Sequence, residues 1–256
     1  MGFALYNKLR TLISPEKLGS GMTNQSDITV KLDDRIRLMS AVLSATDWPD
    51  KSQEQQPHGT HAHSRGTRKF LEAFRTHEAV QGLQGLLNQG APMEAAFALA
   101  LQMSWPKLEI AELPRWAPPR WNEQLADFYT KSNLAKWWRD EDSVWQAGHV
   151  ESKKMFENVS FKPFLKNFFG DIPEELIFIP SISYPTDLDL ALRNPGELVC
   201  IVHPRLAWGD SPPWPFDEDP GYLYRTALSQ YGRVLMLAYL RNNAEKVAPV
   251  AENALP

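Results

Sequence analysis

The apolar residues of this 256-residue chain follow helical spacing over its first two thirds and strand-like spacing only later. Repeats of three and four residues predict amphipathic helices between residues 35 and 156. Short continuous apolar runs, typical of buried strands, follow at 176–179 and 198–202. One early alternating run, from Ile28 to Leu32, predicts a short strand before the first core helix. Helices that precede a small late β-sheet favour an α+β fold that is predominantly helical.

Capping residues and prolines place the ends of the predicted elements. Asp33 or Asp34 caps the first core helix. The last helix begins with Asp219 as its N-cap and Pro220 in its first turn, and its apolar face continues to Leu240. The segment 47–66 is polar and predicts a loop, and residues 159–161 carry a strand signal. The other expected helices cover about 67–87, 93–103, 122–130, 132–139 and 141–156.

Prolines and tryptophans are concentrated between Trp105 and Trp214. Because proline interrupts both helices and strands, this region should consist of short elements joined by ordered loops. The chain is short enough for one hydrophobic core. The predicted organisation is therefore an N-terminal arm and linker over residues 1–26, a single globular domain over 27–241 and a frayed tail over 242–256.

Charge and composition exclude several function classes. The net charge is −4 and basic residues do not occur in blocks, so we expect no nucleic-acid partner. No stretch approaches the roughly 20 apolar residues of a membrane span, and the N-terminus lacks the apolar segment of a signal peptide. We therefore expect a cytoplasmic protein without membrane insertion. The single cysteine, Cys200, lies in an apolar run and should be buried.

Three of the six histidines, His58, His61 and His63, form the most conspicuous chemical cluster. Imidazoles at this spacing can bind Zn²⁺. Their polar segment offers nothing that would fix their geometry, however, and structural metal sites need such support. A solvated cluster is the first interpretation, and a metal site is the alternative.

Other chemical motifs are incomplete. His77-Glu78 begins like a zinc-peptidase motif, but no second histidine follows it. Neither a nucleophile elbow nor a glycine-rich phosphate loop occurs. The acidic run 217–219 is typical of a helix start. Seven tryptophans are either core residues or part of an aromatic groove: Trp116, Trp121, Trp137, Trp138, Trp145, Trp208 and Trp214.

Four segments carry a further pattern: Ile28-Thr-Val-Lys-Leu-Asp-Asp-Arg with the helix after it, Phe70-Leu-Glu-Ala-Phe-Arg-Thr-His-Glu-Ala-Val, Leu125-Ala-Asp-Phe-Tyr, and Ile179-Pro-Ser with Ile201-Val-His-Pro. Together they resemble a family of gluzincin-type zinc metallopeptidases of unknown function, over about residues 27–240. In such families the last helix carries His-Glu-x-x-His. Its two histidines share one helix face and bind Zn²⁺, and the glutamate activates water.

The corresponding stretch of this chain is Ser229-Gln230-Tyr231-Gly232-Arg233. Serine is a poor zinc ligand, glutamine cannot act as a general base, and arginine remains cationic and repels a metal. The resemblance therefore implies a metallopeptidase-like scaffold without zinc or another cofactor.

Three classes of function remain open. The first is a pseudoenzyme that binds a peptide, a protein or a small-molecule ligand in a cleft that has lost its zinc site. Its pocket is expected between the loop 204–219 and the exposed side of the last helix, because prolines restrict that loop. The second is a metal-dependent hydrolase that uses His58, His61, His63 or His203. The third is a structural or assembly protein. Candidate ligand contacts for the first class are Trp208, Trp214, Ser229, Gln230 and Arg233.

Overall fold

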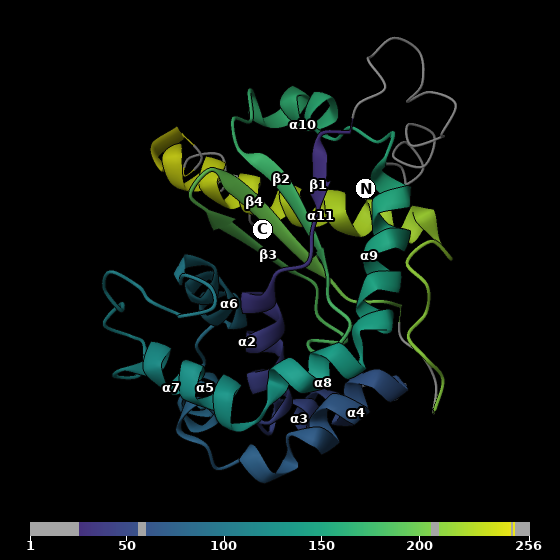
Figure 1. The fold of residues 1–256 in the computed structure, drawn as a ribbon. Coiled ribbons are helices and arrows are strands. Elements are labelled where there is room, and N and C mark those ends of the chain that lie inside the picture. The colour runs from purple at the N-terminus through teal and green to yellow at the C-terminus, as the bar shows by residue number, and fades with distance from the viewer. Residues whose placement is uncertain (1–25, 56–59, 206–209, 247, 249–256) are drawn as a thin grey trace.

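The computed structural model describes residues 26–55, 60–205, 210–246 and 248, which form an α+β fold with a four-stranded sheet (Figure 1). Helices make up most of the regular structure, as the sequence predicts. The elements are β1 (Ile28–Val30), α2 (Asp34–Ser44), α3 (Trp48–Glu54), α4 (Ala62–Phe70), η1 (Glu72–Phe74), α5 (Glu78–Asn88), α6 (Met93–Gln102), α7 (Trp121–Lys131), α8 (Leu134–Asp140), α9 (Asp142–Phe156), α10 (Lys162–Phe169), β2 (Glu175–Pro180), β3 (Leu190–Asn194), β4 (Glu197–Val202) and α11 (Pro220–Asn242).

The sheet has the strand order β1-β2-β4-β3. Strands β1, β2 and β4 run parallel, with Leu176 of β2 opposite Leu198 of β4. Strand β3 pairs antiparallel with β4 at one edge. Between these two strands the chain turns at Gly196, whose φ of +78° lies in a region that glycine adopts readily.

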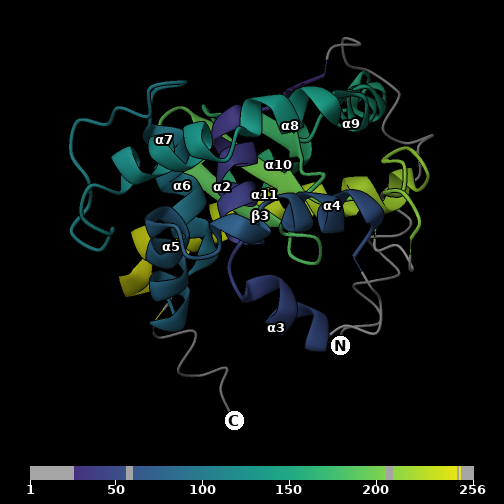
Figure 2. The same ribbon diagram turned by 60° about the horizontal axis from the view of Figure 1, so that its bottom comes forward.

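Both faces of the sheet are covered, so its central strands are apolar without interruption. In β2, Ile177 and Ile179 belong to a core shared with α2, α5, α6 and α7. Leu176 and Phe178 belong to a second core shared with α9, α10 and α11. Figure 1 shows α11 crossing behind the sheet, and Figure 2 shows the layer from α2 to α8 coming forward when the molecule is turned. Because side chains alternate along a strand, one apolar run serves both cores.

The start of the last helix is confirmed. Asp219 Oδ1 accepts a hydrogen bond from the N–H of Tyr222 at 2.9 Å, and α11 begins at Pro220. The helix ends at Asn242, slightly beyond the predicted Leu240. Cys200 is also buried, as predicted. The buried side of α11 is formed by Leu223, Ala227, Tyr231 and Leu235.

The prediction of a polar loop over residues 47–66 is wrong. Residues 48–54 form α3, and α4 begins at Ala62. The buried face of α4 consists of His63, Ser64 and Thr67, which are polar. A helix that buries polar side chains has no hydrophobic periodicity, and the sequence pattern therefore does not reveal it.

The sequence pattern also misses β3 and α10, and the strand expected at residues 159–161 is wrong. The carboxylate of Asp27 accepts hydrogen bonds from the backbone N–H groups of Phe161 at 2.9 Å and Lys162 at 2.7 Å. These are N–H groups at the start of α10 that lack partners within the helix. Their cap comes from a distant part of the chain, so a local pattern does not contain it.

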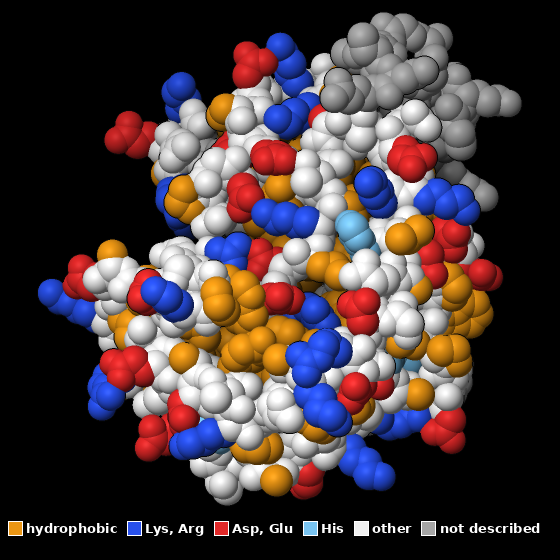
Figure 3. Space-filling model, viewed as in Figure 1, with side chains coloured by type: hydrophobic (Ala, Val, Ile, Leu, Met, Phe, Trp, Pro, Cys, Tyr) orange, Lys and Arg blue, Asp and Glu red, His pale blue; other side chains and the backbone are white. Residues whose placement is uncertain are grey.

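The predicted arm, residues 1–26, lies outside the described residues except for Ser26, whose side chain bonds to the backbone of Ile28. Beyond α11, residues 244–246 are helical, and most of the rest of the predicted tail is not described. No helix within the described ranges is long and apolar enough to cross a membrane. On the face drawn in Figure 3, acidic and basic side chains are interspersed.

Candidate functional site

The structure gives two residues of the predicted histidine cluster, His61 and His63, a fixed, buried setting. His58 lies outside the described residues. His61 is 3% exposed and caps α4, where its Nδ1 accepts a hydrogen bond from the N–H of Ser64 at 3.3 Å. Its Nε2 lies 3.1 Å from Ser64 Oγ. Burial lowers the pKa of His61 to about 3, with further lowering by His63, His203 and Arg65. The interpretation of His61 and His63 as a solvated cluster is therefore wrong.

His63 is buried in the first turn of α4. Its Nδ1 lies 2.5 Å from Glu141 Oε2, and its ring meets that of Trp145 edge-on. Its Nε2 has no hydrogen-bond partner among the described residues. Burial lowers the pKa of His63, against an opposing effect of Glu141. The contacts with Glu141 and Trp145 hold the imidazole of His63 in place.

A third buried histidine, His203, follows β4. Its Nε2 lies 3.5 Å from Asp189 Oδ1, and burial raises the pKa of that carboxyl group. Within the described part of the chain, no three or more His, Cys, Asp or Glu side chains are arranged to hold a metal ion.

The contact between His61 and Ser64 does not form a nucleophile–base pair. Because Nδ1 of His61 accepts the backbone hydrogen bond, its proton resides on Nε2. The Ser64 hydroxyl donates instead to the carbonyl oxygen of Ser183, at 2.8 Å. A general base must accept the proton of its nucleophile, and this arrangement points the proton the other way.

Ser229, Gln230 and Arg233, the residues that the resemblance aligns with a zinc motif, lie on α11 away from its buried face. Ser229 is exposed, and Tyr231 between the two ends of the motif is buried. Arg233 Nε donates to Gln230 Oε1 at 3.1 Å, and Arg233 Nη2 lies 3.2 Å from Glu94 Oε1 of α6. Arg233 is thus part of a surface ion pair between two helices, and its charge is already matched by a carboxylate.

The tryptophans separate into core and surface residues. Trp121, Trp138 and Trp145 are buried, which confirms that at least one of the adjacent Trp137 and Trp138 belongs to the core. Arg37 lies between two of them, with its guanidinium carbon 4.4 Å from the ring centre of Trp138 and 4.6 Å from that of Trp145. These buried indoles contribute to structure rather than to a ligand groove.

Trp214 is 40% exposed and Trp116 is also exposed, whereas Trp208 lies outside the described residues. Trp214 lines a pocket together with residues of α9, and that pocket includes none of Ser229, Gln230 and Arg233. The pocket that Trp214 lines is therefore not the one expected against the last helix. The segment packs against α9, which contacts β1 and β2, whereas α11 contacts β3 and β4.

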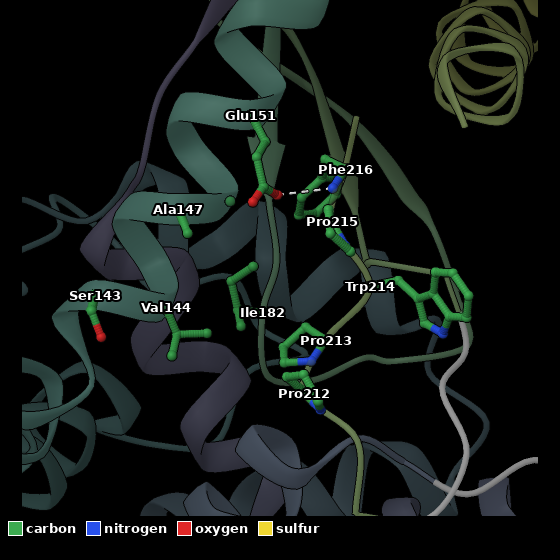
Figure 4. Close-up of a pocket in the computed structure, with 11 residues that line it drawn as sticks. Ser143, Val144, Ala147, Glu151, Ile182, Pro212, Pro213, Trp214, Pro215 and Phe216 are labelled. Carbon is green, nitrogen blue, oxygen red and sulfur yellow. Dashed lines mark hydrogen bonds between the residues drawn. The ribbon is translucent and has the colours of Figure 1, made fainter. Parts of the chain in front are cut away.

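We call this cavity of about 250 Å³ the α9 pocket. One wall is a stripe along α9, and the other is the proline-rich segment 212–216, with Ile182 between them (Figure 4). The indole of Trp214 points away from α9 in this view, so prolines form most of the second wall. The lining residues are Ser143, Val144, Ala147, Gly148, Glu151, Ile182, Pro212, Pro213, Trp214, Pro215 and Phe216.

The proline-rich segment is held at several points. Phe216 is buried and meets the ring of Phe178 edge-on at 6.3 Å. Its N–H donates to Glu151 Oε2 at 2.9 Å. At the other end, the carbonyl of Ser211 accepts a hydrogen bond from the N–H of Ala62 at 3.0 Å. Anchored ends and fixed proline φ angles make the pocket preformed.

Gly148 allows α9 and this segment to approach each other. A Cβ atom at this position would lie 2.7 Å from Ile182 Cδ1 and 3.2 Å from the ring of Phe216. The sequence carries a signal for this surface: small or apolar side chains recur at 144, 147 and 148, beside the buried stripe of Trp145 and Phe156. Such a second stripe indicates a surface that another segment covers.

Glu151 is the one ionisable group among the described residues that line the pocket. Burial raises its pKa and the neighbouring Asp217 raises it further, whereas the hydrogen bond from Phe216 and the charge of Lys154 lower it. Lys154 Nζ pairs with Asp217 Oδ2 at 3.1 Å. The α9 pocket thus combines apolar walls with one half-buried carboxylate.

Comparison of the chain with protein-family models, with curated proteins and with solved structures gave no match. The site is therefore interpreted from its own geometry. The chain is an α+β protein with a preformed, mainly apolar pocket beside α9.

Proposed function

We propose that this protein is a non-catalytic binding domain on a metallopeptidase-like scaffold, and that it holds an exposed segment of another protein in the α9 pocket. The observation that carries the proposal is the pocket itself, which combines rigid proline walls with a single acidic group. Apolar pockets with few convergent polar groups are the usual form of a binding site.

The volume favours a single side chain over a larger ligand. About 250 Å³ is less than the roughly 300–1,000 Å³ of pockets that enclose drug-sized molecules. A protein segment that inserts one anchor residue fits this size, and buried anchors contribute most of the affinity at protein interfaces. A preformed pocket also lowers the entropy lost on binding.

The chemistry of α11 supports a function without catalysis. Ser229 and Gln230 stand where the resemblance implies a zinc ligand and a general base. Arg233 stands where it implies the second ligand, and it already pairs with Glu94. A cationic side chain in this position opposes a metal ion.

The test is a selection of peptides from a displayed random library on the full chain, followed by fluorescence polarisation of individual peptides. Ala147 is exposed on the pocket wall, so Ala147→Trp should fill the cavity and weaken binding at least about tenfold. The control is Val150→Trp, because Val150 is 62% exposed on α9 and does not line the pocket. Equal weakening by both variants, or no enriched peptide, would contradict the proposal.

The alternative of a metal-dependent hydrolase has less geometric support. His61 has both ring nitrogens in contact with Ser64, and His63 Nδ1 contacts Glu141. Elemental analysis of untagged protein, purified without chelator, checks the alternative directly. We expect no stoichiometric zinc, and one zinc per chain retained through dialysis would favour the hydrolase.

A further inference from the structure

The carboxylate of Glu151 faces the α9 pocket from the end of the helical stripe (Figure 4). Its Oε2 accepts the hydrogen bond of Phe216, and its Oε1 has no hydrogen-bond partner in the described part of the chain. Lys154, whose charge acts on Glu151, forms its ion pair with Asp217. One acceptor position of Glu151 is therefore left for a ligand.

The surroundings of Glu151 carry further negative charge. Asp217, although it pairs with Lys154, lies close enough to raise the pKa of Glu151. Glu218 on the same segment and Asp142 at the start of α9 are exposed. A cationic group that approaches the pocket is attracted by this charge, and an anionic group is repelled.

Any occupant that fills the pocket removes Glu151 from water. A neutral apolar side chain would bury the second oxygen of this charged carboxylate, Oε1, without a donor, which is unfavourable. Lysine and arginine combine an aliphatic stem with a charged end, so one side chain can contact the apolar walls and also donate to Glu151. The stem would lie between Val144 and Ala147 on one side and Pro213 on the other.

We infer that the α9 pocket accepts a lysine or arginine side chain of the bound protein segment, and that Glu151 is the residue that determines this specificity. The inference rests on the proposed function, since it names the side chain that the same pocket selects.

The experiment follows amide chemical shifts of the full ¹⁵N-labelled chain. The two probes are Nα-acetyl-lysine methylamide and Nα-acetyl-norleucine methylamide, which share an unbranched aliphatic stem and differ in the ammonium group. The lysine probe should shift the amide of Gly148 and bind at least about tenfold more tightly than the norleucine probe, because a charge-assisted hydrogen bond is formed only by the ammonium.

Two variants separate the pocket carboxylate from the general charge. Glu151→Gln keeps an oxygen that accepts from Phe216 N–H but removes the charge, so the preference for lysine should disappear while the fold persists. Glu218→Gln removes a nearby exposed charge that does not line the pocket and should retain the preference.

Three other outcomes would contradict the specificity, the role of Glu151 or the proposed function. If norleucine binds the wild-type chain as tightly as lysine, the specificity is refuted and the pocket remains a binding site. If Glu218→Gln abolishes the preference as completely as Glu151→Gln, the selection arises from the overall charge and the role of Glu151 is refuted. If neither probe shifts Gly148 and no selected peptide binds there, both the specificity and the proposed function fail.

Discussion

The buried imidazole of His61 should make the stability of this protein depend on pH. Its pKa is about 3 in the folded chain, against an ordinary value of 6.5 in the unfolded chain. Between these values the unfolded state binds one proton more than the folded state, so stability rises with pH. The full contribution is present above the unfolded pKa and is lost as the pH falls below it. Linkage gives a loss of about 2 kcal/mol by pH 5.

Urea unfolding of the wild type and of His61→Asn, between about pH 8 and pH 5, measures this contribution. Asparagine is a favourable N-cap and does not titrate, so the helix start is retained while the proton-binding group is removed. The wild type should lose about 2 kcal/mol more than the variant over this range. The unfolding free energy of both proteins should decrease with urea concentration at a similar slope, since the surface exposed on unfolding is unchanged.

The comparison with a variant is needed because other buried groups titrate as well. Burial lowers the pKa of His63 and therefore destabilises the fold in acid, whereas the raised pKa of Asp189 acts in the opposite direction. Taking the difference between two proteins that share these groups removes most of their effect. If the difference in unfolding free energy between the wild type and His61→Asn is the same at pH 8 as at pH 5, the assignment of a neutral buried His61 is refuted.

Other substitutions test the two cores and the pocket. Tyr231 is 1% exposed and donates to the carbonyl of Ile177, so Tyr231→Ala should cost about 3–5 kcal/mol in chemical denaturation, and a loss below about 1 kcal/mol would show that it is not core. Deleting residues 1–26 should change the melting temperature by only a few degrees, because the residues after them are enough to form one hydrophobic core. By contrast, Asp27→Ala should lower the free energy of unfolding by about 1–2 kcal/mol, because it removes the cap of α10. Gly148→Ala should lower the free energy of unfolding by about 1–3 kcal/mol, because the added Cβ would clash with Ile182 and Phe216. Gly232 has open space around it, so Gly232→Ala should raise the free energy of unfolding by up to about 1 kcal/mol. If both variants have the same effect in thermal unfolding, the pocket walls adjust freely.

The sequence predicts those elements whose information is local. The helices near 93–103, 122–139 and 141–156 have apolar residues that face a core, and their spacing appears within each segment. The last helix has its own cap in Asp219 and Pro220. Strands β2 and β4 are continuous apolar runs because each is covered on both faces. These elements can be predicted without knowing which other segments pack against them.

The α4 and α10 helices were not predicted because their stabilising contacts come from elsewhere in the chain. His61 and Ser64 look like solvated loop residues until the segment after β2 covers them and supplies the carbonyl oxygen of Ser183. The start of α10 has no cap of its own and uses Asp27.

The candidate site divides in the same way. The sequence by itself determined that prolines restrict the segment before the last helix, and the alignment of Ser229, Gln230 and Arg233 with a zinc motif stays a prediction from the resemblance. Only the tertiary structure decided that this segment lies against α9, because the approach depends on the missing side chain of Gly148 and on the hydrogen bond from Phe216 to Glu151. A pocket is formed by surfaces distant in the chain, and its position follows from their contact rather than from either pattern alone.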